Sequence, residues 1–219
     1  MRLIIATAIL LVICATSSSQ TDQSLREVKG RVIKSASTPA VDLEFGKGFK
    51  YAGGHKFVLY DVATAEQHFF VDADKNGRIK RMYWVQFEGY LPSNNNSYTY
   101  KGNKLINIAG LDFFADAYAR NIKANPGRPD GDGARGRAFL ESKGFKLGSD
   151  ETLSLRLLHF IGEKKRDELM IIYLEDMSAA LGLTAADVST GGKSEGQWSD
   201  ISDALLARAQ KDLKIKQRN

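Results

Sequence analysis

The chain has 219 residues, of which 43% are hydrophobic, and a formal net charge of +5 at pH 7. A chain of this length buries roughly 70% of its surface on folding, so a hydrophobic core can hold it together without disulfides. The only cysteine is Cys14, near the amino terminus. This excludes a disulfide scaffold, thiol nucleophiles and iron–sulfur ligation in the rest of the chain.

The first 19 residues have the pattern of a secretory signal peptide. Arg2 supplies a positive charge, residues 3–14 form an uncharged apolar run, and residues 15–19 are small or hydroxylic. The run has the length of a signal-peptide core and is too short to span a bilayer. We therefore predict cleavage near Ser19 and export by the secretory pathway, to a bacterial periplasm or the extracellular medium. We expect no transmembrane helix in the mature chain.

The sequence argues against a lipid anchor and against a nucleic-acid partner. Lipoprotein signals place a small residue before the cysteine that is lipidated, whereas Ile13 precedes Cys14 here. The basic residues are spread along the chain apart from its tail, and nucleic acid is an unusual partner for an exported protein.

After a polar, flexible arm over residues 20–28, the pattern of residues 29–219 is that of one α+β domain. Short stretches rich in β-branched and aromatic residues are separated by Gly, Pro and Ser, which is typical of an antiparallel meander. Asn76-Gly77 between two apolar runs predicts a hairpin. The strands predicted in this half are 31–34, 41–45, 56–62, 67–71 and 78–91.

Three helices are predicted. Residues 111–122 carry apolar side chains at the i, i+3, i+4, i+7 spacing of an amphipathic helix. Residues 133–143 form a short helix with Asp132 as its N-cap. Residues 197–214 form the last helix, whose end is expected to fray into the basic tail.

A second hairpin is predicted between these helices. Apolar runs at 152–162 and 168–177 flank a charged turn, and both runs are apolar on both faces, which favours central, doubly covered strands. The strands and helices do not alternate regularly, so a parallel sheet is not expected. The predicted fold is α+β: a twisted antiparallel sheet of about six to eight strands covered by about three α-helices.

Two stretches match the sequence patterns of catalytic or cofactor-binding motifs, but the segments that flank them do not fit those motifs. Residues 131–136 spell G-x-G-x-x-G, but a helix end and a loop precede them, not the buried strand of a dinucleotide site. Residues 192–196 spell G-x-S-x-G after a polar loop, and no histidine follows His159 to complete a hydrolase triad. We therefore expect no nucleotide and no other cofactor.

Asp72, Asp74 and Asn76 match the first half of a calcium-binding loop. Oxygens at positions 1, 3 and 5 with glycine at position 6 suit a hard cation. However, the acid of position 12 is replaced by Tyr83, and the flanks are predicted strands. A β-turn in which Asp and Asn bond their own backbone explains the same residues, and weak calcium binding is the alternative.

Polar residues within apolar strands are the best lead to a binding site. Burying Glu or Arg is costly unless the charge is paired, so these residues form an ion pair, line a pocket, or lie near strand ends in solvent. Regular alternation places Arg156 and His159 on opposite faces. The candidate ligand-binding residues are Trp84, Gln86, Glu88, Arg156 and His159.

Two functions remain open. The favoured one is a non-catalytic exported protein that binds a small or lipid-like ligand, or a protein partner, in a groove between sheet and helices. The alternative is a hydrolase-type enzyme whose site assembles around Glu88 and His159, with an acid such as Asp176.

Overall fold

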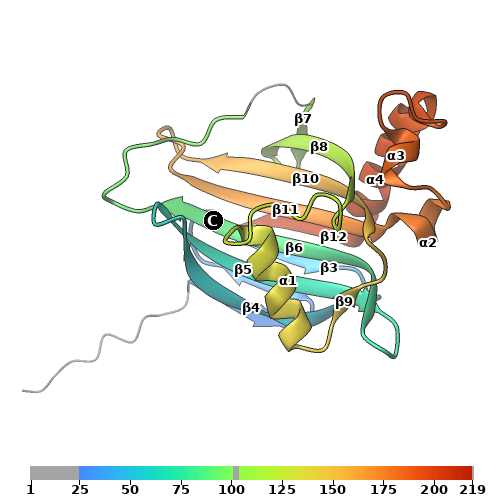
Figure 1. The fold of residues 1–219 in the computed structure, drawn as a ribbon. Helices are drawn as coiled ribbons and strands as arrows, with labels where there is room; N and C mark the ends of the chain where they lie inside the picture. Colours follow the sequence, from blue (N-terminus) through green and yellow to red (C-terminus); the bar gives the residue numbers. More distant parts are fainter. Residues whose placement is uncertain (1–24, 101–103, 219) are drawn as a thin grey trace, which may run out of the picture.

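Two β-sheets packed face to face make up most of the fold (Figure 1). The computed structural model describes residues 25–100 and 104–218, so the predicted signal peptide, Cys14 and most of the predicted arm lie outside the described residues. The protein is mostly β, with few helices. Within the described residues, no helix has the length and apolar character needed to cross a bilayer.

The larger sheet has eight strands, and neighbouring strands along its main path are antiparallel. The short strand β9 (Lys146–Leu147) pairs in parallel with the start of β6. In spatial order, the main path is β4 (Lys50–Leu59), β5 (Ala63–Ala73), β6 (Arg78–Tyr90), β11 (Asp167–Asp176), β10 (Glu151–Ile161), β8 (Leu111–Asn121) and β7 (Lys104–Ile108). Both predicted hairpins are confirmed: β5 pairs with β6, and β10 pairs with β11.

The smaller sheet joins the two ends of the described chain. Its strands, in spatial order, are β1 (Arg26–Lys29), β2 (Val32–Ser35), β3 (Val41–Phe45) and β12 (Leu213–Gln217). β12 pairs with β3 directly after α4 (Trp198–Asp212) ends. The remaining helices are α1 (Asp132–Ser142), α2 (Met177–Leu181), α3 (Ala185–Val188) and a 3-10 turn at Glu195–Gln197.

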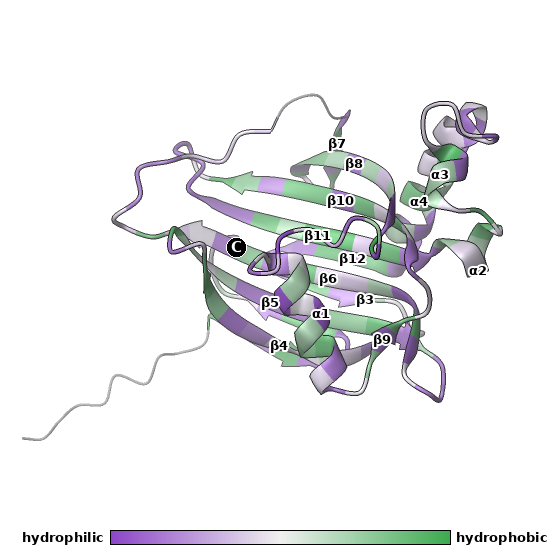
Figure 2. Ribbon diagram, viewed as in Figure 1, coloured by the Kyte–Doolittle hydropathy of each residue, from purple (hydrophilic) through white to green (hydrophobic). Residues whose placement is uncertain are grey.

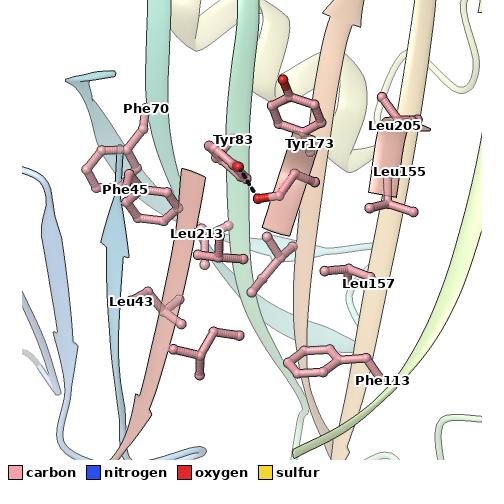
Figure 3. Close-up of a cluster of buried hydrophobic side chains, with 14 of the residues drawn as sticks. Leu43, Phe45, Phe70, Tyr83, Phe113, Leu155, Leu157, Tyr173, Leu205 and Leu213 are labelled. Carbon is pink, nitrogen blue, oxygen red and sulfur yellow. Dashed lines mark hydrogen bonds between the residues drawn. The ribbon is translucent and has the colours of Figure 1, made fainter. Parts of the chain in front are cut away.

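The main core lies between the two sheets. The Phe45 ring of β3 stacks on Phe70 of β5 at 4.0 Å between centroids, and it lies 5.0 Å from Tyr83 of β6. Leu205 of α4 closes the same core beside β10 (Figure 3). The hydroxyl of Tyr83 donates a hydrogen bond to the Ala209 carbonyl of α4 at 2.6 Å. Because these contacts use one parity of each strand, they leave the other face of the larger sheet to a second layer.

That second layer is α1, which lies in front of the larger sheet in Figure 1. Phe139 and Leu140 of α1 pack on Phe69 and Met82 of the sheet. The close approach depends on Gly136, because a Cβ there would lie 3.0 Å from the Phe69 ring. The central strands β10 and β11 are mostly hydrophobic in their middle parts (Figure 2), as expected for strands covered on both faces.

Three predictions of secondary structure are wrong. Residues 111–121 form strand β8, because every second residue from Leu111 to Ala119 is apolar, so the stretch fits a two-residue period as well as a helical one. The basic tail does not fray: Leu213 and Ile215 are buried on the core side of β12, and lysines alternate with them. Residues 26–28 of the predicted arm belong to β1, which pairs with β2.

The predicted fold is confirmed in its coarser part, an antiparallel sheet of eight strands. The second sheet was not foreseen. The helices at 132–142 and 198–212 are found close to their predicted bounds, although Gly131 and not Asp132 is the N-cap of α1.

Candidate functional site

Four of the five predicted binding residues share the sheet face that α1 covers. Trp84, Gln86 and Glu88 alternate along β6 with the core residues of the opposite parity. Across the sheet, Ile172 of β11 lies between Trp84 and Arg156 in the hydrogen-bonded register. These residues therefore belong to one continuous surface, which we call the α1 face.

His159 lies on the other face. Its ring packs 5.5 Å from the ring of Phe113, a core residue, and its Nδ1 lies 2.9 Å from the backbone carbonyl of Asp112. The opposite orientation of Arg156 and His159 follows the regular alternation of β10. The structure therefore does not bring Glu88 and His159 together.

A row of hydrogen bonds crosses β5 and β6 on the α1 face. The amide of Gln67 donates to Gln86 Oε1 at 2.8 Å and to the Asp132 carbonyl at 3.2 Å. Gln86 donates to Glu88 Oε2 at 2.5 Å, and the Tyr98 hydroxyl donates to Glu88 Oε1 at 2.7 Å. Burial raises the pKa of Glu88, and the hydrogen bonds from Tyr98 and Gln86 oppose that rise. The row ties the start of α1 to the sheet.

Glu168 adds a second carboxyl group to this surface. It lies directly opposite Glu88 in the register of β11 and β6, and it is 8% exposed. Burial raises the pKa of Glu168 to about 8, and the charge of Glu88 adds to the rise. Glu168 therefore favours its protonated form near neutral pH.

Arg156 is paired, not free in solvent. Its Nη2 contacts Asp116 Oδ2 of β8 at 2.8 Å, and Tyr100 donates to the same oxygen at 2.7 Å. Arg156 also contacts the Tyr100 hydroxyl. The charge of Arg156 is thus paired with Asp116, although its buried Nε has no hydrogen-bond partner among the residues that the structure describes.

An apolar pocket of about 80 Å³ lies between α1 and the sheet. A second hollow of about 210 Å³ adjoins it and shares Ile122, Arg137, Leu140 and Leu147. The indole Nε1 of Trp84 is buried and has no hydrogen-bond partner among the residues that the structure describes. The lining of the first pocket is Phe69, Met82, Trp84, Tyr118, Arg120, Ile122, Gly133, Gly136, Arg137, Leu140, Leu147, Thr152, Ser154, Ile172 and Leu174.

A larger cavity of about 500 Å³ opens where β1 meets the ends of β4, β5 and β6. Its charged groups already pair with one another: Arg26 lies 3.2 Å and Lys56 3.4 Å from Glu66. The Arg26 guanidinium also lies 4.2 Å from the centroid of the Phe87 ring. This cavity is roomier, but its charged groups are engaged with one another, whereas the pocket beneath α1 is mostly apolar and is lined by Trp84 with its buried Nε1.

The predicted calcium loop is the tight turn between β5 and β6. Asp74 Oδ1 accepts hydrogen bonds from the backbone N–H groups of Asn76 and Arg78, at 2.8 and 3.0 Å. Asp72 pairs with Arg81 at 2.8 Å. Among the described residues, no group of three His, Cys, Asp or Glu side chains is arranged to hold a metal ion. The geometry is that of the β-turn interpretation.

Comparisons with known proteins give this chain no relative. No family model, no curated protein and no solved structure matches it. The argument for function therefore rests on the site alone.

Glu168, Arg120 and Arg137 are the site residues that sequence reasoning missed. Glu168 stands on the second predicted hairpin, but only the register of β6 with β11 places it opposite Glu88. Arg120 was assigned to a helix, which concealed that it shares a face with Arg156 and Tyr118. Arg137 is one of two arginines on α1, and only the packing of that helix shows that Arg137, and not Arg135, lines the pocket.

Proposed function

We propose that this chain is an exported binding protein for a small molecule with an apolar part, which it holds in the pocket between α1 and the larger sheet. The observation that carries the proposal is the buried Nε1 of Trp84, which has no acceptor within residues 25–100 and 104–218. A buried N–H group that lacks a partner costs roughly 1–3 kcal/mol. A ligand that brings an oxygen acceptor would recover that energy.

The shape of the pocket supports a ligand with a short apolar segment. Phe69, Met82, Leu140 and Ile172 line it, so its walls are largely hydrocarbon. A volume of about 80 Å³ holds roughly two or three groups the size of a water molecule. The adjoining hollow of about 210 Å³ gives room for the rest of a longer molecule.

Hexan-1-ol is a suitable probe, and the indole N–H signal of Trp84 in a ¹H–¹⁵N spectrum is the readout. The Trp198→Phe variant removes the other tryptophan of the chain and leaves a single indole signal. We expect hexan-1-ol to shift that signal saturably, because its hydroxyl can accept from Nε1.

The Gly133→Leu variant tests whether the probe binds in the pocket between α1 and the larger sheet. A Cβ at Gly133 would lie 4.0 Å from the Trp84 ring, so a leucine there fills the pocket without a backbone clash. We expect this variant to abolish the response, whereas Gly196→Leu, at an exposed glycine distant from α1, leaves it intact. An unchanged response in Gly133→Leu, or none in the parent protein, would overturn the proposal.

Export is proposed from Arg2 and the apolar run of residues 3–14. The mass of the protein recovered from the exported fraction of its own host gives the cleavage point. A mass that retains residues 1–19 contradicts this part of the proposal, and a lipid adduct on Cys14 contradicts the expectation of no anchor.

Acid–base catalysis at Glu88 and Glu168 is a second candidate function. Glu168, whose pKa burial raises to about 8, faces Glu88, and two neighbouring carboxyl groups in different environments can serve as general acid and general base. Under this hypothesis Glu88 is the base and Glu168 the acid, and His159 takes no part. A screen of ester and glycoside substrates with wild type and Glu168→Gln tests it, and activity that survives Glu168→Gln counts against it.

A further inference from the structure

We infer that the ligand of the α1 pocket is an aliphatic monocarboxylate, whose charged group lies between Arg120 and Arg137 at the rim. This inference rests on the proposed function and names the class of ligand for that site. The apolar walls support the aliphatic part of the ligand, and the charged residues of the lining support its carboxylate.

The charge of the pocket lining is one-sided. Among the described residues, the lining of this pocket contains two arginines and no acidic residue, whereas Glu141 and Asp150 line the adjoining hollow. The pocket's neutral polar groups include the hydroxyls of Tyr118, Thr152 and Ser154 on β8 and β10. A cation placed there would meet only positive charge, whereas an anion would be attracted by both guanidinium groups.

Arg120 projects from β8 on the α1 face, directly opposite Thr152 of β10. Its backbone carbonyl accepts a hydrogen bond from Thr152 Oγ1 at 3.1 Å, which fixes the main chain there. Among the described residues, no carboxylate forms a salt bridge with the Arg120 side chain. Its guanidinium charge is therefore available to a ligand.

Arg137 reaches the same pocket from the second turn of α1. Its Nη2 donates to the Pro126 carbonyl at 2.9 Å, which engages one of five N–H donors and positions the group. Salt bridges within the described part of the chain do not include it either. It lines both hollows, so it stands where the apolar pocket meets the adjoining space.

The nearest acid on β10 is engaged elsewhere. Glu151 accepts hydrogen bonds from Asn121 Nδ2 at 2.5 Å and from the backbone N–H of Ala185 at 2.7 Å. Glu151 forms no salt bridge with either arginine in the described part of the chain. The guanidinium fork suits the two oxygens of a carboxylate, and the unmet N–H of Trp84 lies in the same pocket.

The test compares three probes that differ only in their polar end: hexanoate, hexan-1-ol and hexylammonium. Titrations follow the Trp84 indole signal in the Trp198→Phe background at pH 7 and low ionic strength. We expect hexanoate to bind roughly tenfold more tightly than hexan-1-ol, and hexylammonium to bind more weakly than either. Added salt should reduce the difference between hexanoate and hexan-1-ol.

The variants Arg120→Gln and Arg137→Gln test whether these two side chains bind the carboxylate of hexanoate. Each variant should weaken hexanoate binding roughly five- to tenfold and leave hexan-1-ol binding unchanged, which also reports that the pocket is still folded. Arg218→Gln is the matched control, because it removes the same charge from the smaller sheet. It should change neither affinity.

The outcomes separate the two proposals. Equal affinity for hexanoate and hexan-1-ol, with no effect of either arginine variant, overturns this inference and leaves the proposed function standing. Binding of neither probe overturns both. Hexanoate binding that is weakened equally by Arg218→Gln also overturns the inference, because the attraction would then belong to the overall charge of the protein.

Discussion

Glu168 and Glu88 face each other across the β11–β6 pair, on the sheet face that α1 covers. Glu88 receives hydrogen bonds from Tyr98 and Gln86, which stabilise its ionised form. Glu168 lies in a more apolar setting, 8% exposed. Two like charges directly opposite each other on neighbouring strands are destabilising. We conclude that Glu168, whose pKa burial raises to about 8, favours its protonated form near neutral pH.

The first prediction concerns the pH dependence of stability. The pKa of Glu168 is about 8 in the folded protein against 4.5 as its ordinary value, so the folded state binds more protons between these pH values. Stability should therefore fall as pH rises from about 4.5 to about 8. We expect Glu168→Gln to remove this pH dependence. At pH 8.5 the unfolding free energy of the variant should exceed that of wild type by on the order of 3 kcal/mol.

Urea unfolding at pH 5 and at pH 8.5 measures the effect. Glu27→Gln, at an exposed position, is the control and should leave the pH profile of wild type in place. Parallel profiles for wild type and Glu168→Gln would show that Glu168 is ionised throughout.

The second prediction concerns the ion pair between α4 and β11. Arg208 Nε and Nη2 each contact a carboxylate oxygen of Glu175 at 2.8 Å, and Tyr173 donates to Oε1 at 2.6 Å. Glu175 is 4% exposed, so Arg208→Ala leaves a buried carboxylate without its cation. We expect a loss of about 2–4 kcal/mol of unfolding free energy, because a single buried charge is strongly unfavourable.

Chemical denaturation of Arg208→Ala checks this value, with Lys211→Ala as a control on the exposed side of the same helix. Arg208→Lys should be intermediate, since an ammonium group cannot make both contacts. If Arg208→Ala lowers the unfolding free energy no more than Lys211→Ala does, the ion pair between Arg208 and Glu175 adds nothing to stability.

The third prediction concerns the end of α4. The last four carbonyls of a helix have no partner within it, and Ala209 lies in the last turn of α4. Its carbonyl instead accepts from the buried hydroxyl of Tyr83, as drawn in Figure 3. Tyr83→Phe keeps the ring packing but leaves the Ala209 carbonyl without its hydrogen bond. This should lower the unfolding free energy by about 1–2 kcal/mol. Tyr90 is half-buried in the same strand, so Tyr90→Phe should lower the unfolding free energy by less than Tyr83→Phe.

The fourth prediction concerns the turn between β5 and β6. Because Asp74 accepts from two backbone N–H groups, Asp74→Ala should lower the unfolding free energy, and by less than Tyr83→Phe because the turn is exposed to water. Millimolar calcium should leave the melting temperature of wild type unchanged. A rise with calcium that is lost in Asp74→Ala would restore the cation-binding alternative.

The sequence was sufficient for features set by local chemistry. Asn76-Gly77 marks a hairpin because the turn requires a residue that tolerates a positive φ, and Gly77 has φ of +75°. Arg156 and His159 differ by an odd number of positions, so their opposite orientation follows from strand geometry alone. The polar face of β6 could be predicted for the same reason.

Features set by packing could not be predicted. Residues 111–121 fit both periods, and only pairing with β10 decides between them. The lysine-rich tail is a strand because β3 offers it an edge and the core accepts Leu213 and Ile215. The role of Glu168 depends on which residue of β6 it faces, which one sequence does not reveal.

The pairing of β12 with β3 has a consequence for biosynthesis. The smaller sheet pairs Phe45 of β3 with Leu213 of β12. Residues 46–212 must therefore all be synthesised before that contact and the core beneath it can form. For a chain that crosses a membrane through a narrow translocon, as proposed here, the same order of events leaves β3 unpaired with β12 while the residues between them are still being exported.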